Sequence, residues 1–328
     1  VTSVQLTSPG DMSVVPFGGA LPMQKSESGL WQTTVEGVGP GTYRYAFVVD
    51  GVVVVDPSNR AVSESNRNVW SLVDVPGNPF MDQGDVPHGA VAEVHYPSAV
   101  RERQRRLHVY TPPGYERGGG EYPVFYLLHG AMDSDDAWTT LGRAGFILDN
   151  LIAAGAAQPM VVVMRDGHIG PFTMGRSPMR LEAFAEEFAS DIKPFIEANY
   201  RVSQARAKTA IAGLSMGGAH TLEIAVSDLS EYAYVGVFSS GVFGVADSTD
   251  WQDRHAAALA NADARGGLEV FWFATGEEDF LLETTHATVE LMKQHGFDVE
   301  YHESKGGHTW VNWREYLHTF AGRLFVGE

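Results

Sequence analysis

The chain has 328 residues, of which 44% are hydrophobic, and it carries a formal net charge of -18 at pH 7. This length predicts two domains, and the deficit of Lys and Arg disfavours nucleic acid, anionic membranes and highly anionic small molecules as partners. The sequence contains no cysteine, which excludes disulfides, thiolate metal sites and a cysteine nucleophile, and no apolar run is long enough to span a membrane.

The first part of the chain, to about Pro76, is predicted to be all-β. Short β-prone runs are separated by turn signals, among them Asp50-Gly51, a hairpin dipeptide between two β-branched runs. These runs cover residues 3–7, 30–35, 43–49 and 52–55. We therefore expect a small immunoglobulin-like β-sandwich over residues 1–80.

The same part resembles a known group of domains. Trp31, the segment Gly39-Pro40-Gly41-Thr42-Tyr43-Arg44-Tyr45-Ala46-Phe47-Val48-Val49-Asp50-Gly51 and Asp56-Pro57 are similar to the early-set domains of carbohydrate-binding module family 48. Some members of that group bind polysaccharide, and others only support a catalytic domain. The aromatic side chains are expected to pack inside the sandwich more than to form a sugar platform; they are Trp31, Tyr43, Tyr45 and Phe47.

From about residue 81 to residue 328, apolar strand-like runs alternate with helix-like segments. The runs cover residues 107–110, 124–128, 160–164, 209–212, 234–238 and 270–274. The clearest helix covers residues 182–199, where apolar residues recur every three or four positions. Strands that are apolar throughout and are separated by helices predict a mostly parallel sheet with helices on both faces. The expected fold is therefore α/β, an α/β-hydrolase domain.

A serine lies between glycines in Gly213-Leu214-Ser215-Met216-Gly217, after an apolar run and before a helix-compatible segment. This is the strand, sharp turn and helix context of a nucleophile elbow, in which the serine has a strained backbone and neighbouring side chains would collide. The short pattern alone is also compatible with an incidental serine in a glycine-rich turn. We interpret Ser215 as the candidate nucleophile.

A serine nucleophile needs a base and an acid, which follow it along the chain in this fold class. Among the histidines after Ser215, His308 is favoured because it lies on a glycine-flanked loop after the last expected strand, residues 299–303. His220 and His318 are expected inside helices. For the acid, Asp279 is preferred because its spacing from Gly276 clears the strand end, and Glu278 stays an alternative.

The remaining site residues are predicted from the same logic. The backbone N–H groups of Met216 and of Ala131 or Met132, the latter two in the loop after Leu127-Leu128-His129-Gly130, are expected to form the oxyanion hole. His129 is expected to hold this loop by hydrogen bonds. Aromatic side chains that either form an acyl-binding wall or pack in the core are Trp310, Trp138 and Phe172.

The catalytic part resembles the esterase D-like group, most of all carbohydrate esterase family 1, the feruloyl and acetylxylan esterases. The resemblance is carried by the segments Val109-Tyr110-Thr111-Pro112-Pro113-Gly114-Tyr115, Tyr122-Pro123-Val124, His129-Gly130, Asp149-Asn150-Leu151-Ile152, Gly213-Leu214-Ser215-Met216-Gly217-Gly218 and Gly307-His308-Thr309-Trp310. It implies the triad Ser215, Asp279 and His308, in agreement with the residue-level prediction. It also implies a serine esterase that releases ferulate or a similar hydroxycinnamate from arabinoxylan or its oligosaccharides.

Several alternatives stay open at this point. They are an acetylxylan esterase, an enterochelin-type siderophore esterase, a thioester hydrolase such as S-formylglutathione hydrolase and, among non-enzymes, a glycan-binding protein. No cofactor is expected, and no histidine and carboxylate spacing suggests a metal. The start at Val1 suits a mature form without its targeting segment, so a secreted or periplasmic location is expected from function alone.

Overall fold

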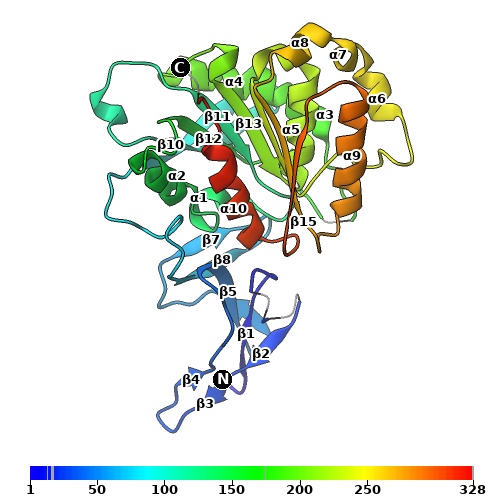
Figure 1. Ribbon diagram of the computed structural model, residues 1–328. Helices are drawn as coiled ribbons and strands as arrows, with labels where there is room; N and C mark the ends of the chain where they lie inside the picture. Colours follow the sequence, from blue (N-terminus) through cyan, green and yellow to red (C-terminus); the bar gives the residue numbers. More distant parts are fainter. Residues whose placement is uncertain (13, 16–17, 174, 327–328) are drawn as a thin grey trace.

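Two parts of different architecture follow one another in the computed structural model, which describes residues 1–326 except 13, 16, 17 and 174 (Figure 1). The first part is all-β, as predicted. Its strands are β1 Val4–Thr7, β2 Ala20–Pro22, β3 Gln24–Lys25, β4 Trp31–Gln32, β5 Gly41–Val49, β6 Val52–Val54, β7 Val62–Glu64 and β8 Val69–Val75. We call residues 1–80 the β-domain; this boundary remains a prediction.

The long strand β5 organises the β-domain. Its residues 46–49 pair with β1 and its residues 41–45 pair with β8, so one strand joins the two halves of a six-stranded antiparallel sheet. The turn to β6 is formed by Asp50 and Gly51, both with positive φ, as the hairpin signal predicts. Tyr43 is buried with Met12 and Val15, whereas Trp31 lies half-buried on the separate β3–β4 ribbon.

The second part is built on an eight-stranded sheet with the order β16-β15-β14-β13-β11-β12-β10-β9. The strands are β9 Ala90–Ser98, β10 Arg103–Thr111, β11 Val124–Leu128, β12 Val161–Arg165, β13 Thr209–Leu214, β14 Tyr234–Phe238, β15 Val270–Gly276 and β16 Glu300–Ser304. All are parallel from β12 to β16, and β10 and β9 are antiparallel additions at one edge. Every predicted strand of this part is present.

Helices cover both faces of this sheet (Figure 1). The helices are α1 Ala137–Thr140, α2 Ala144–Ala153, α3 Leu181–Glu187, α4 Lys193–Asn199, α5 Met216–Ser227, α6 Asp250–Arg254, α7 Ala256–Ala260, α8 Ala262–Gly266, α9 Leu282–Gln294 and α10 Trp310–Ala321. Alternate strand residues enter two separate cores: Phe125 and Leu127 pack towards α1, α2 and α10, and Tyr126 and Leu128 towards α3, α5 and α9. This confirms the α/β-hydrolase prediction.

Two local features differ from the prediction. The helix expected over residues 182–199 is present, but a π-helical stretch, Phe188–Ile192, separates α3 from α4. Strand β9 was not expected, because most of its residues are exposed and it contains Pro97 and Glu93. Such residues are typical of an edge strand, where no further strand needs the backbone N–H groups.

The β-domain lies at the edge of the large sheet where the parallel strands end, with β7 and β8 close to α1 and α10 (Figure 1). Contacts confirm this placement: Arg314 of α10 donates to the Thr42 carbonyl of β5, and Thr140 of α1 donates to Ser63 of β7. The connecting segment is also held, since Asn150 of α2 donates to the carbonyl oxygens of Pro79, Phe80 and Asp82. The junction is therefore ordered, as its sequence predicts.

Candidate active site

Ser215 occupies the sharp turn between β13 and α5, with φ 52° and ψ -119°. A Cβ on Gly213 would lie 2.3 Å from the Gly217 carbonyl oxygen, and one on Gly217 would lie 2.6 Å from the carbonyl oxygens of Leu128 and His129. Real Cβ atoms do not approach backbone this closely, so both glycines are needed for the turn to form. The turn also receives a hydrogen bond from Ser240, whose hydroxyl donates to the Ser215 carbonyl at 2.6 Å.

Three side chains predicted to form a triad lie within hydrogen-bond distance of one another. The Nε2 atom of His308 is 3.0 Å from Ser215 Oγ, and its Nδ1 atom is 3.0 Å from each carboxylate oxygen of Asp279. The Asp279 side chain is fully buried, while that of His308 is 17% exposed. A neutral imidazole with its proton on Nδ1 can therefore accept the serine proton at Nε2.

The environment keeps Asp279 ionised. Burial acts to raise its pKa, but hydrogen bonds from His308 and from the Leu281 N–H outweigh burial, and the pKa lies below the ordinary value. Glu278, the alternative acid, points into solvent and is exposed. The structure thus brings Asp279 to His308 and leaves Glu278 outside.

The two helical histidines have other surroundings. His220 is fully buried against the ring of Phe184, with ring centroids 4.2 Å apart, and burial followed by the nearby His129 lowers its pKa to about 3. His318 lies in α10 against Phe80. Neither contacts Ser215, in agreement with the packing role expected from the sequence.

The two expected oxyanion residues lie together beside the nucleophile. Ala131 and Met216 belong to one buried cluster, and the loop passes so close that a Cβ on Gly130 would lie 3.4 Å from Ser215 Cβ. Among the described residues, neither the Ala131 N–H nor the Met216 N–H donates to a protein acceptor. Unpaired N–H groups on two residues beside the nucleophile are suited to bind a developing oxyanion.

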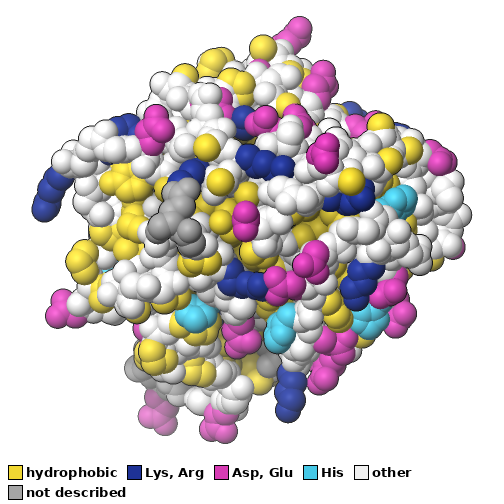
Figure 2. Space-filling model, turned by 45° about the horizontal axis from the view of Figure 1, so that its top comes forward, with side chains coloured by type: hydrophobic (Ala, Val, Ile, Leu, Met, Phe, Trp, Pro, Cys, Tyr) yellow, Lys and Arg dark blue, Asp and Glu magenta, His cyan; other side chains and the backbone are white. Residues whose placement is uncertain are grey.

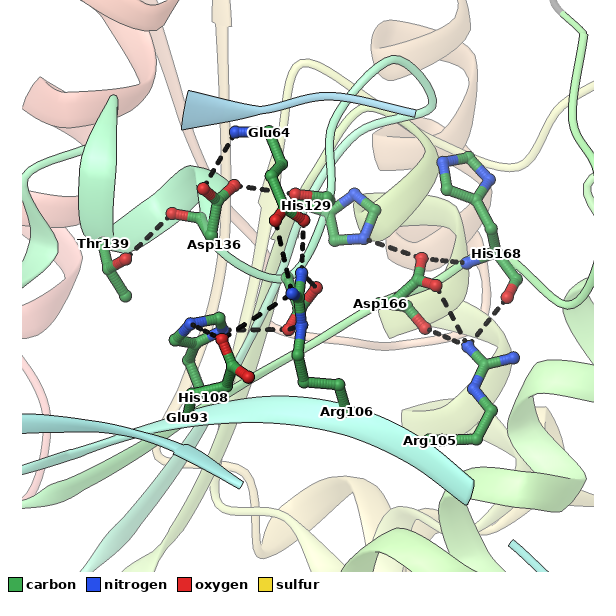
Figure 3. A network of polar contacts seen from close by, with 12 residues as sticks. Glu64, Glu93, Arg105, Arg106, His108, His129, Asp136, Thr139, Asp166 and His168 are labelled. Atoms are coloured by element: carbon green, nitrogen blue, oxygen red, sulfur yellow. Dashed lines mark hydrogen bonds and ion pairs between the residues drawn. The ribbon is translucent and has the colours of Figure 1, made fainter. Parts of the chain in front are cut away.

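His129 fixes this loop as predicted. Its Nδ1–H donates to the Gly130 carbonyl at 2.7 Å, and its Nε2 accepts from the Gly167 N–H at 2.8 Å. The second bond ties the loop after β11 to the loop after β12. Figure 3 shows Asp166 in that second loop directed at the His129 ring, with its carboxylate 3.5 Å from Nε2.

The aromatic side chains proposed as a binding wall have different positions. Trp138 and Trp310 are 1% and 3% exposed and pack edge to face at 5.0 Å, with the Trp138 indole N–H donating to the Leu128 carbonyl. We therefore assign both rings to the core, because rings with so little free surface cannot form the wall of an open pocket. Phe172 is also buried, but it contacts Ala131 and Met216 and so lies at the candidate oxyanion hole.

Two features were missed by sequence reasoning. The first is the contact of Ser240 and Trp313 with the triad. The Ser240 hydroxyl donates to the Ser215 carbonyl, and the Trp313 ring packs edge to face against His308 with ring centroids 4.9 Å apart. Phe280, next to the acid, packs at 4.3 Å on the His308 ring and is nevertheless 73% exposed. Its position directly after Asp279 is the signal that sequence reasoning could have used.

The described residues contain no cluster of three or more His, Asp or Glu side chains suited to hold a metal ion. None of the helices in the described part of the chain has the length and apolar character needed to cross a membrane. On the face shown in Figure 2, basic and acidic side chains are interspersed, and no continuous basic surface forms there.

Comparisons with known proteins found a matching family model, similar sequences and similar solved structures. The family model Esterase matches residues 98–324. An endo-1,4-beta-xylanase/feruloyl esterase of Xylanibacter ruminicola is 30% identical over 318 residues, 94% of this chain, and the chain spans only 42% of that relative's length. A solved ferulic acid esterase is 25% identical with a TM-score of 0.61, covering 73% of this chain and 99% of its own.

One further solved structure extends over the β-domain as well. The enterobactin esterase of Shigella flexneri, determined in the presence of enterobactin, covers 99% of this chain and 88% of its own. Its TM-score is 0.65 and its identity is 17%, so the likeness concerns the fold. The arrangement of a β-domain before this α/β domain therefore occurs in another solved structure.

Proposed function

Because this chain belongs to the Esterase family, we propose that it is a serine esterase that hydrolyses hydroxycinnamate esters of plant cell-wall arabinoxylan or its oligosaccharides. The observation that carries the reaction is the hydrogen-bonded line from Ser215 through His308 to Asp279. The acyl preference is supported by the feruloyl esterases among the similar proteins. A carbohydrate ester outside the cell suits a secreted or periplasmic enzyme.

In this proposal Ser215 Oγ attacks the ester carbonyl while His308 Nε2 takes the hydroxyl proton. The carbonyl oxygen becomes an oxyanion that receives hydrogen bonds from the N–H groups of Met216 and Ala131. The tetrahedral intermediate collapses, the C–O bond to the alcohol breaks, and His308 gives its proton to the leaving sugar hydroxyl. Asp279 stays ionised and stabilises the imidazolium throughout.

The acyl-enzyme is then hydrolysed by the same groups in reverse order. Water loses a proton to His308 as its oxygen attacks the acyl carbonyl, and the proton returns to Ser215 Oγ when the acid leaves. No cofactor enters these steps. The net reaction is ester plus water to acid plus alcohol.

We place the leaving sugar near Phe280. Its ring lies on His308, the group that protonates the leaving oxygen, and most of the ring is exposed. A flat apolar ring beside this proton donor offers a stacking surface for the apolar face of a pyranose or furanose. The β-domain, which resembles carbohydrate-binding module family 48, is proposed to lie beside the same polysaccharide.

The test compares initial rates on methyl ferulate, methyl p-coumarate, 4-nitrophenyl acetate, acetylated xylan and a linear catecholate ester. The proposal expects the highest kcat/KM on the hydroxycinnamates, and no turnover above background in a folded Ser215→Ala variant. Activity confined to acetyl or catecholate esters would keep the triad and overturn the substrate. Retained turnover by Ser215→Ala would remove this serine from the mechanism.

A further inference from the structure

The loop from His129 to Asp136, between β11 and α1, carries three buried carboxylates in succession around Ser134. Asp133, Asp135 and Asp136 are 4%, 3% and 9% exposed. Buried carboxylates are costly unless each has a charged or hydrogen-bonding partner. Their partners therefore determine where this loop lies, and the loop carries the Ala131 N–H. We call residues 129–136 the oxyanion loop.

Asp133 has its partner in the β-domain. Its carboxylate is 2.7 Å from a guanidinium nitrogen of Arg44 on β5, and both side chains are buried. Asp133 is also part of the turn beside the nucleophile, because its N–H donates to the Gly130 carbonyl at 3.1 Å. Arg44 thus acts on a residue only two positions after Ala131.

Two other nitrogens of the Arg44 guanidinium, Nε and Nη2, donate inside the β-domain. They bond to the Ser63 hydroxyl at 2.9 Å and to the Glu64 carbonyl at 2.7 Å, both on β7. A guanidinium held at this many points is fixed in direction as well as in place. Its ion pair with Asp133 therefore transmits the position of the β-domain sheet to the oxyanion loop.

Two backbone hydrogen bonds also join the β-domain to the oxyanion loop. The Glu64 N–H donates to the Asp136 carboxylate at 2.9 Å, and the Asn66 N–H donates to the Met132 carbonyl at 3.1 Å. Figure 3 shows the Glu64 N–H directed at Asp136 and the Glu64 carboxylate directed at Arg106 of β10 below it. The middle and the C-terminal end of the oxyanion loop are thus held by β7 and the turn that follows it.

The same turn also contacts Phe172, which packs beside the candidate oxyanion residues. The Asn66 side-chain amide and the Arg67 guanidinium donate to the Phe172 carbonyl at 3.0 and 3.2 Å. Phe172 packs against Ala131 and Met216, the two candidate oxyanion residues. One hairpin of the β-domain therefore contacts both loops that enclose the nucleophile.

We propose that the β-domain is a positioning element of the esterase site, and that Arg44 is a positioning residue that sets the Ala131 N–H through Asp133. This inference rests on the proposed function. It assigns the β-domain a role in the chemical step for every ester, including small esters without sugar. Glycan contact by the same domain would be separate from this role.

The test uses the full-length chain and methyl ferulate as a small substrate. In an Arg44→Met variant, kcat is expected to fall about 10- to 100-fold while KM stays within about twofold, because a misplaced oxyanion donor matters most in the transition state. The inhibition constant of phenylboronic acid, which forms a tetrahedral adduct on Ser215, should rise with the fall in kcat. That of ferulic acid, the planar product, should stay unchanged.

Three further single variants and one double variant separate positioning from general stability. Arg44→Lys keeps the charge and should restore part of kcat, and Asp133→Asn should reproduce Arg44→Met without adding to it in the double variant. The control is Asp74→Asn, which removes another contact between the two parts, the 3.2 Å ion pair of Asp74 with Arg143, and should keep native kcat. Thermal unfolding midpoints identify any variant that does not fold. The kcat values of the remaining folded Arg44 and Asp133 variants then test whether Arg44 positions the oxyanion loop.

The inference is overturned if folded Arg44→Met and Asp133→Asn keep kcat within about twofold of the native enzyme. It is also overturned if KM and both inhibition constants change in parallel with kcat, since that pattern indicates general distortion. Ser215→Ala separates this outcome from failure of the proposed function. Loss of activity in Ser215→Ala together with unchanged Arg44 variants leaves an esterase whose β-domain has no positioning role.

Discussion

The Nδ1 atom of His308 lies 3.0 Å from both carboxylate oxygens of Asp279, a residue 29 positions earlier in the chain. The contact follows from the sheet: β15 and β16 are parallel neighbours, so the loops after them leave at the same edge. The loops are joined by hydrogen bonds from the Glu277 N–H to Ser304 and from the Glu278 N–H to Gly306. Gly276 has room only for a hydrogen atom, since a Cβ would lie 2.2 Å from the Gly306 carbonyl oxygen.

Replacing the acid tests this relationship. Asp279→Asn should lower kcat/KM on methyl ferulate by about 10³-fold or more, because an amide no longer stabilises the imidazolium or fixes its tautomer. The matched control is Glu278→Gln, which changes the neighbouring exposed carboxylate and should stay within about twofold of the native rate. A large loss in Glu278→Gln with little loss in Asp279→Asn would reverse the assignment of the acid.

Gly217 is predicted to be irreplaceable for packing. An alanine here would place its Cβ 2.6 Å from two backbone carbonyl oxygens, so the loop after β11 would have to move. We expect Gly217→Ala to lower the free energy of unfolding by about 1–3 kcal/mol, measured by urea denaturation, and to lower kcat as well. Gly119→Ala is the control, because nothing lies within 4 Å of its added Cβ. Equal stability of the two variants would contradict the crowding argument.

Much of this architecture could be predicted from the sequence, because local patterns carry it. The strands of the parallel sheet are apolar over their whole length, and the elbow at Ser215 needs small residues at fixed positions. The triad follows from the order of strand ends along the chain. Local patterns thus define each element and the loop on which each candidate residue lies.

The remainder depends on contacts between distant segments. Nothing near Arg44 in the sequence indicates that Asp133, 89 positions away, is its partner. In the sequence, Trp138 and Trp310 fit a pocket wall as well as a core, because an aromatic side chain next to a loop can serve either purpose. Their assignment to the core rests on the packing of one ring against the other in the folded chain. The exposure of Phe280 is likewise a tertiary property.

Phe280 is predicted to affect sugar esters more than simple esters. If its exposed ring stacks on the leaving sugar, Phe280→Ala should lower kcat/KM for a feruloylated arabinoxylo-oligosaccharide about 3- to 10-fold, a loss typical of one aromatic contact. The loss on methyl ferulate should be smaller, because methanol has no ring to stack. Phe280→Leu keeps an apolar group but loses the flat surface, and it should resemble Phe280→Ala on the oligosaccharide. Equal losses on both substrates would indicate that Phe280 acts only by packing against His308 and does not contact the sugar.

His220 is predicted to make the fold sensitive to acid. Its pKa is lowered to about 3 from an ordinary value of 6.5, chiefly by burial, although a backbone contact with Met179 acts to raise it. Because the folded-state pKa is depressed, its contribution to stability is present above pH 6.5 and is lost as the pH falls towards 3. Between pH 6.5 and pH 4 the loss should be on the order of 3 kcal/mol, measured by urea unfolding. His220→Leu should show a smaller fall over this range, whereas His95→Leu, at an exposed position, should keep the native dependence. An unchanged pH dependence in His220→Leu would show that other groups control acid unfolding.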